Sequence, residues 1–282
     1  MNKKKTILIT GATSGIGKAT LLKLAHSPDR YIFIARNKEK AEQTKREVIE
    51  QCKNKDVDFY LADLSRIEEV KKVADEISAK ESRIDTLINN AGILGPDEKQ
   101  LTDEGFELTF ATNHLSMFLL SNLLLPLLEK SNTARVINVS SEAHRITSFN
   151  LNNLQGEEGY SSLRAYSLSK MCNILFTIEA AKRWLYNFFL FQGMHPGGVN
   201  TNFGEGKGFI RNLAFILAKP FFISPEKGAE TIIYLAQNDI GLKVNGKYLK
   251  KKKIIEPSKS AKDVENALKL WNLSTALVKS HL

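Results

Sequence analysis

The stretch TILITGATSGIGKAT, residues 6–20, decides the fold. Its first five residues are mostly apolar and predict a buried strand, and three glycines, Gly11, Gly15 and Gly17, come soon after it. Glycine permits a tight turn and lets backbone approach a ligand closely. The helical pattern that begins here would present free amides at its first turn, where a pyrophosphate binds well. A glycine triplet alone is weak evidence, but this one has a strand before it and a helix after it.

Strand-like and helix-like segments alternate through the rest of the chain. Short apolar runs predict strands, and the longer stretches between them, such as IEEVKKVADEISAK, have helical periodicity. Strands that alternate with helices form crossover units, whose parallel sheet is covered by helices on both faces. No linker divides the chain, so we predict an α/β fold with one doubly wound Rossmann-type domain over residues 1–282 and about seven strands. The further strands are expected at 31–35, 57–62, 84–89, 135–140, 188–194 and 246–250.

The composition is that of an ordinary soluble globular protein, with 282 residues, of which 43% are hydrophobic and 25% charged. No apolar run approaches the ~20 residues of a membrane span. The apolar run near the N-terminus is too short for the core of a signal peptide and leads straight into the glycine loop. We therefore expect a soluble, cytoplasmic protein without a signal peptide or transmembrane segment.

The cysteines, histidines and charges indicate no metal or nucleic-acid site. Cys52 and Cys172 predict buried free thiols, and the five histidines lack the spacing of zinc ligands. The net charge is +9, but apart from KKK near the start and KKKK at 250–253 the basic residues are spread out. Solvated termini and loops explain these runs best. We expect no metal and no nucleic-acid partner.

Two late segments favour particular roles. GFIRNLAFILAKPFFI, residues 208–223, is apolar with few charges and follows the last strong strand, where an α/β fold places its ligand crevice. A substrate lid, spanning about 202–223, or a membrane-surface helix is favoured over a core helix. KDVENALKLWNLSTALV predicts an amphipathic C-terminal helix at about 260–279, whose apolar positions pack into the core.

The ends of the second, third and fourth strands indicate how a dinucleotide would be bound. A fold that prefers NAD usually has an acidic residue after the second strand, but here Ala35 is followed by Arg36. An arginine pairs well with a 2′-phosphate, which favours NADP(H) over NAD(H); the alternative is a surface arginine at a strand end. Asp63, after the third strand, is placed to bond the adenine or to cap the next helix. The small residues of NNAG, 89–92, let backbone lie close to a ligand.

Tyr166 and Lys170 lie four residues apart in AYSLSK, on one face of a predicted helix. A phenol titrates near pH ~10, and a fixed ammonium nearby favours the phenolate and lowers that pKa. Such a pair would exchange a proton with a substrate oxygen. For an isolated Tyr-x-x-x-Lys, however, an exposed helix face is the better explanation, so the rest of the chain has to decide.

Five motifs occur in a characteristic order: TGATSGIG, NNAG, NVSS, YSLSK and HPGG, covering roughly residues 5–201. Each is weak alone, but the ordered set resembles the short-chain dehydrogenase/reductase family with high specificity. FATNHLSMFLL, VINVSSEAH, NLQGE and HPGGVNT are similar to the retinol dehydrogenase-like branch in particular. The resemblance excludes the exposed-face explanation of the tyrosine and lysine.

The resemblance implies a catalytic set of Asn113, Ser141, Tyr166 and Lys170, in which Ser141 is preferred over Ser140 because the second serine of NVSS is the family's catalytic one. Tyr166 would give a proton to a carbonyl oxygen or take it from an alcohol, and Lys170 would lower the tyrosine's pKa and hold the nicotinamide ribose. Ser141 would bond the substrate oxygen, and Asn113 would help to hold a water that links Lys170 to solvent. Besides Tyr166 and Lys170, the implied cofactor contacts are Gly11, Thr13, Ser14, Gly15, Ile16, Gly17, Arg36, Asp63, Leu64, Asn90, Ala91, Gly92, Pro196, Gly197, Val199 and Thr201.

The expected function is reversible hydride transfer by an NADP(H)-dependent oxidoreductase that interconverts a carbonyl and an alcohol on a small apolar substrate. The alternative is a catalytically idle NADP(H)-binding sensor or scaffold, which predicts losses in the catalytic set, yet all four residues are present. Family members often form dimers or tetramers through their long helices, so a homodimer or homotetramer is one expectation. The apolar segment 208–223 favours instead a monomer in peripheral contact with a membrane.

Overall fold

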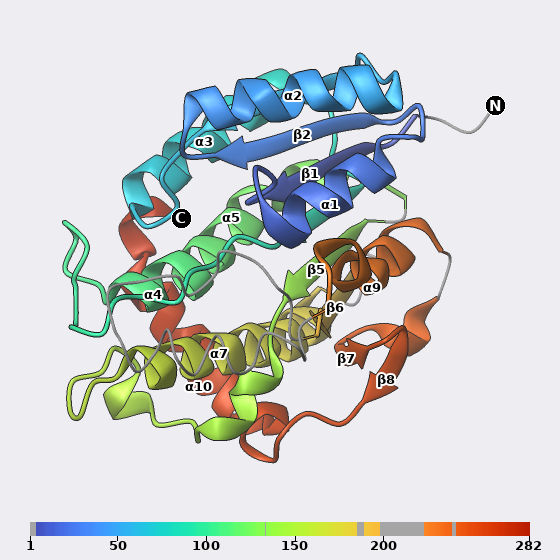
Figure 1. Cartoon of the computed structure of the whole chain (residues 1–282). Coiled ribbons are helices and arrows are strands. Elements are labelled where there is room, and N and C mark those ends of the chain that lie inside the picture. The colour runs from blue at the N-terminus through green and yellow to red at the C-terminus, as the bar shows by residue number, and fades with distance from the viewer. Residues whose placement is uncertain (1–3, 133, 185–188, 198–222, 239–240) are drawn as a thin grey trace.

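The computed structural model describes residues 4–132, 134–184, 189–197, 223–238 and 241–282. These residues form one α/β domain around an eight-stranded sheet in the order β3-β2-β1-β4-β5-β6-β7-β8 (Figure 1). The first seven strands pair in parallel, and β8 is antiparallel to β7. The strands are β1 (Thr6–Thr10), β2 (Arg30–Ala35), β3 (Val57–Leu61), β4 (Thr86–Asn89), β5 (Arg135–Val139), β6 (Leu190–His195), β7 (Lys247–Lys250) and β8 (Lys253–Ile255).

This topology confirms the predicted doubly wound domain. The additional strand comes from the run of four lysines, which was predicted as a solvated loop. Lys250 ends β7, Lys251 and Lys252 form the turn with φ of 49° and 64°, and Lys253 begins β8. A tight hairpin needs left-handed residues at its centre, which is why these two lysines adopt that conformation.

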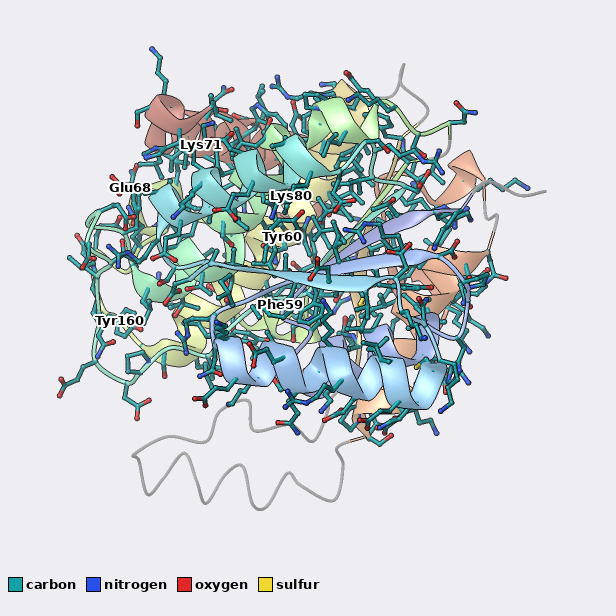
Figure 2. All side chains as sticks on the ribbon, turned by 90° about the horizontal axis from the view of Figure 1, so that it is seen from above. Phe59, Tyr60, Glu68, Lys71, Lys80 and Tyr160 are labelled. Carbon is teal, nitrogen blue, oxygen red and sulfur yellow. The ribbon has the colours of Figure 1, made fainter. Side chains whose placement is uncertain are left out.

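Helices cover both faces of the sheet (Figure 1). The side chains of β1 alternate between two apolar cores: Ile7 and Ile9 face one, and Leu8 faces the other. Figure 2 shows the same alternation at the sheet's edge, where Phe59 points towards α2 and Tyr60 towards α3. One layer holds α1 (Gly15–Leu24), α2 (Lys38–Cys52) and α9 (Pro225–Gln237); the other holds α3 (Ile67–Lys80), α5 (Ser116–Leu123), α6 (Leu125–Leu128) and α7 (Ser162–Arg183), with α10 (Val264–Leu277) on α7.

The C-terminal helix packs into the core, as predicted. It is bounded by 3₁₀ turns at 260–262 and 279–281. Trp271 stacks on Phe176 of α7 with ring centroids 5.7 Å apart and meets Phe118 of α5 edge-on at 5.0 Å. This aromatic cluster places α10 over both α5 and α7. The structure does not test the oligomeric state.

The helix that precedes α5 contains a π turn. It runs from α4 (Leu108–Phe110) through a π-helical stretch at Ala111–Leu115 into α5. The π turn carries Asn113 and His114, both buried. His114 Nε2 lies 2.9 Å from Ser274 Oγ of α10. Extra-residue turns of this kind often re-aim side chains at functional sites.

Cys52 and Cys172 are buried free thiols, as predicted. Within the described ranges, no cluster of three or more His, Cys, Asp or Glu side chains is arranged to hold a metal ion. In the same ranges, none of the helices is both long and apolar enough to traverse a bilayer. The predicted lid at 202–223, the segment 208–223 and the contact residues Val199 and Thr201 lie outside the described residues, except for Ile223.

Buried histidines predict loss of stability in mild acid. Burial lowers the pKa of His114 to about 3 and that of His195 to about 4. In the unfolded chain both bind protons below pH ~6.5, so the free energy of unfolding is highest above that pH. It should fall by about 1.4 kcal/mol per pH unit for each histidine as the pH decreases from ~6.5 towards 4. Urea denaturation at pH 7.5 and 5.0 measures the slope, and His114→Gln should remove one histidine's share; an unchanged slope would contradict the assignment.

Candidate active site

The glycine loop after β1 meets the segment after β4 at the point where the strand order reverses. Gly11 has φ of 68°, and a Cβ there would lie 2.9 Å from Ala91 Cα. A Cβ on Gly17 would collide with Gly11 O and with the Asn90 side chain. Only glycine fits at these two positions. Ligands of doubly wound sheets bind at such switch points, beyond the carboxyl ends of the strands.

Thr10 latches the two segments together. Its Oγ1 accepts hydrogen bonds from the backbone N–H groups of Asn90 and Ala91, each at 2.9 Å, and donates to Ile88 O at 3.4 Å. The Asn90 amide in turn donates to Thr10 O at 2.9 Å and Gly11 O at 3.1 Å. Sequence reasoning did not single out Thr10, although a hydroxyl residue at the end of a buried apolar strand was the available signal.

The first turn of α1 is suited to an anionic ligand. Its N-cap, Ser14, makes no side-chain capping bond, and the turn contains no acidic residue. By contrast, Asn37 caps α2 and Ser161 caps α7, and at α3, whose N-cap makes no side-chain bond, Glu104 Oε1 from a distant loop accepts from Ile67 N. The uncapped amides and the space that glycine leaves match a pyrophosphate. The predicted contacts Thr13, Gly15 and Ile16 lie in the same loop and turn.

Arg36 and Asp63 lie side by side beyond β2 and β3. Arg36 Nη1 is 3.5 Å from Asp63 Oδ2, and Arg36 is 76% exposed. An exposed ion pair of this length contributes little, so the guanidinium remains available to a phosphate. Asp63 does not cap α3; its Oδ1 accepts from Ser65 N and Oγ at 2.9 and 2.7 Å. Leu64 beside it is buried.

Asn113 holds the segment after β4 rather than reaching into open space. Its Oδ1 accepts from Ile93 N at 2.7 Å, and its Nδ2 donates to Ile93 O and Ser169 Oγ, both at 2.9 Å. A Cβ on Gly92 would lie 3.0 Å from Lys170 Nζ and 3.2 Å from Asn113 Oδ1. The predicted water-holding role of Asn113 is not tested, but its side chain borders the lysine.

Ser141, Tyr166 and Lys170 come together at the carboxyl end of β5. The Ser141 hydroxyl hydrogen-bonds the Tyr166 phenol, although the two residues are far apart in sequence. Lys170 is buried, and its Nζ donates to Val139 O at 3.2 Å and lies 5.7 Å from the Tyr166 ring centroid. Ser140, the rejected candidate, donates instead to Lys170 O at 2.6 Å. Its hydroxyl therefore supports α7.

The proton affinities of this group correct one expectation. Burial raises the pKa of the Tyr166 phenol to about 12, and the hydrogen bond to Ser141 offsets part of that rise. Burial also lowers the pKa of the Lys170 ammonium to about 8. Lys170 was expected to lower the pKa of Tyr166, but burial makes the phenolate costly, so the pKa of the phenol lies above its ordinary value. At neutral pH the phenol holds its proton.

A buried polar network joins this site to the sheet. Asn89 Nδ2 donates to Asn138 Oδ1 at 2.9 Å and to Ser121 Oγ of α5 at 3.1 Å. Asn138 Nδ2 donates to Thr177 Oγ1 of α7 at 3.0 Å. The network fixes β4 and β5 to α5 and to α7, which carries Tyr166. This network was not predicted, although Asn89 and Asn138, each within an apolar strand, were a signal in the sequence.

Two further features lie in the segments that follow β5 and β6. Gly197 follows Pro196 after β6 with φ of 104°, and a Cβ there would lie 2.6 Å from Ile223 Cδ1, so the predicted loop also depends on a glycine. A hollow of about 490 Å³ lies between the loop after Ser141 and the start of α7. Its lining is Ile146, Thr147, Ser148, Asn150, Ser161, Leu163 and Arg164.

Comparison with known proteins identifies the arrangement. The family model for short chain dehydrogenases matches residues 5–208. The chain belongs to the short-chain dehydrogenase/reductase family. It lies in the retinol dehydrogenase-like branch: retinol dehydrogenase 12 of Mus musculus is 37% identical over 274 residues, and retinol dehydrogenase 14 of Homo sapiens 36% over 290, each match covering 97% of this chain and 86% of the relative. The family membership makes the protein an oxidoreductase of a group that binds a nicotinamide cofactor.

Solved structures of short-chain dehydrogenases and related proteins share the fold. An uncharacterized protein from Mycobacterium paratuberculosis superposes with a TM-score of 0.79 at 34% identity, covering 98% of this chain and 93% of that chain. A short chain dehydrogenase from Escherichia coli CFT073, complexed with NADPH, has a TM-score of 0.65 at 24% identity, with coverages of 83% and 91%. The second likeness concerns the fold alone.

Replacing Thr10 by valine should destabilise the protein, whereas replacing Thr20 by valine should not. Thr10→Val removes the acceptor of the Ala91 N–H and leaves the Asn90 N–H with Ile88 O alone, which should lower the free energy of unfolding by roughly 1–3 kcal/mol. Thr20 is the matched control, because its hydroxyl is buried and has no hydrogen-bond partner among the described residues. Thr20→Val should be neutral or stabilising. Urea denaturation measures both, and equal effects would refute the latch.

Proposed function

We propose that the protein is an NADP(H)-dependent oxidoreductase that interconverts an aldehyde or ketone and an alcohol on a small apolar substrate, with Tyr166 as the acid/base. The observation that carries this proposal is the hydrogen bond between the partly buried Tyr166 and Ser141, with the buried Lys170 beside it. The three groups occupy the carboxyl edge of the sheet, close to the glycine loop. Bound NADPH would supply the hydride.

The side chains divide the remaining work. Tyr166, protonated at neutral pH, donates its proton to the substrate oxygen during reduction and recovers one from the alcohol during oxidation. Ser141 donates a hydrogen bond to the same oxygen and stabilises the charge that develops on it. The Lys170 ammonium, 5.7 Å from the Tyr166 ring centroid, favours the phenolate once the proton has left. Asn113 bonds to Ile93 and Ser169 and so holds the segment that contains Gly92 against Lys170.

The choice of cofactor rests on Arg36. Its exposed guanidinium stands at the end of β2, where a 2′-phosphate would lie, and no acidic residue follows that strand directly. The E. coli structure with NADPH supports this choice only as a neighbour of the same fold. The apolar substrate is supported by relatives named retinol dehydrogenases, which are 36–37% identical to this chain.

Loss of the phenol should stop turnover without stopping cofactor binding. Tyr166→Phe should lower kcat for carbonyl reduction by about 10²- to 10⁴-fold, because the proton donor is removed. The dissociation constant for NADPH should stay close to that of the unchanged protein. NADPH oxidation with retinal and medium-chain aliphatic aldehydes measures the rate, and Tyr234→Phe, in α9 on the opposite face of the sheet, is the control. Full activity in Tyr166→Phe would refute its role.

Reversal of the charge at Arg36 should weaken the binding of NADPH much more than that of NADH. Arg36→Asp should weaken NADPH binding by roughly 10- to 100-fold, the value of one or two charge-assisted hydrogen bonds, and change NADH binding little. Arg46→Asp, an equal charge reversal on exposed α2 surface, controls for the long-range field. Fluorescence titration with each cofactor gives the dissociation constants. Equal losses for NADPH and NADH would contradict the 2′-phosphate assignment.

A further inference from the structure

His144 connects Ser141 to the C-terminal part of the chain. The ring is fully buried, three residues beyond Ser141. Its Nδ1 lies 2.7 Å from Ser141 O, and Ser258 N donates to its Nε2 at 3.0 Å. The ring of Tyr248 meets it edge-on, with centroids 5.3 Å apart at 81°. Both ring nitrogens are therefore bonded to main chain.

These partners fix the protonation state of the ring. A carbonyl oxygen can only accept, so Nδ1 must carry a hydrogen; a backbone N–H can only donate, so Nε2 must be bare. His144 is therefore neutral, in the Nδ1–H tautomer. Burial lowers its pKa, which agrees with a neutral ring. Ser141 O also accepts from the backbone N–H of His144 at 3.1 Å, so one residue holds this carbonyl twice.

The segment Glu256–Lys262, here called the C-terminal clamp, lies along the loop after β5 (Figure 1). Arg145 donates to Glu256 O, and Phe149 N donates to Ser260 Oγ at 2.8 Å. These two contacts hold the loop but do not touch Ser141. Of the three residues described here that bond to the clamp, His144, Arg145 and Phe149, it is His144 that also bonds to the main chain of Ser141.

We propose that His144 is a positioning residue that fixes Ser141 to the C-terminal clamp, so that the serine hydroxyl stays directed at Tyr166 and the substrate oxygen. The inference rests on the proposed function, in which Ser141 acts on that oxygen. It gives the C-terminal segment a role in the reaction that the family motifs, which end near residue 201, do not contain.

Two substitutions separate the hydrogen bond of His144 to Ser141 from its hydrogen bond to Ser258. An asparagine at this position reproduces the Nδ1–H donor, and a glutamine reproduces the Nε2 acceptor. His144→Asn keeps the tie to Ser141 and loses Ser258; His144→Gln keeps Ser258 and loses Ser141. We expect His144→Gln to slow hydride transfer by roughly 10- to 100-fold with an unchanged NADPH dissociation constant, because a small misplacement of Ser141 is enough. His144→Asn should retain most of the rate.

Single-turnover loss of NADPH fluorescence measures hydride transfer in these variants. Ser260→Ala is the control, because it removes another clamp contact that does not reach Ser141; it should destabilise the protein and keep the rate. Equal losses in the Asn and Gln variants, or losses that follow stability in all three, would overturn the proposal. Inactivity of the unsubstituted protein would instead overturn the proposed function.

A measurement that needs no activity tests the contact itself. Long-range ¹H–¹⁵N spectra of the unsubstituted protein report the tautomer of each histidine, and the signals of His144 are those absent from His144→Asn. We expect Nδ1 to be protonated and Nε2 bare. The Nε2–H tautomer would break both bonds and refute the positioning role, whether or not the variants fold.

Discussion

The close approach of the segment after β4 to both halves of the site is the constraint on which the rest depends. On one side Asn90 lies against Gly17, where even a methyl group would collide. On the other side Gly92 lies over Lys170 Nζ and Asn113 Oδ1. Asn90 and Gly92 thus set the distance between the two halves of the site. One half is the first turn of α1, which suits a pyrophosphate, and the other holds Tyr166, the proposed proton donor.

Burial determines the chemistry that this geometry supports. It raises the pKa of the Tyr166 phenol and lowers that of the Lys170 ammonium, so the charged form of each group is less stable than in water. A neutral phenol bonded to a serine suits proton donation to a carbonyl. Formation of the phenolate is unfavourable in this buried site, and a phenolate beside the lysine is the state that alcohol oxidation requires.

The sequence predicted what short-range patterns determine, and missed what distant residues determine. The parallel strands, the glycine loop and the Tyr166–Lys170 pair follow from local periodicity and motif order. The Thr10 latch, the Asn89–Asn138 network and the contact of His144 with Ser258 join residues 32 to 114 positions apart. The direction of the Tyr166 pKa also depended on burial, which the spacing of two residues does not reveal.

Isotope transfer tests the central claim most directly. The protein is incubated with retinal or a medium-chain aliphatic aldehyde and with NADPH that carries deuterium on one or the other face of C4, and the product is analysed by mass spectrometry. The account predicts an alcohol that carries one deuterium on the former carbonyl carbon with one labelled cofactor and none with the other. Alcohol without deuterium from either cofactor, or cofactor oxidation without any alcohol, would contradict it.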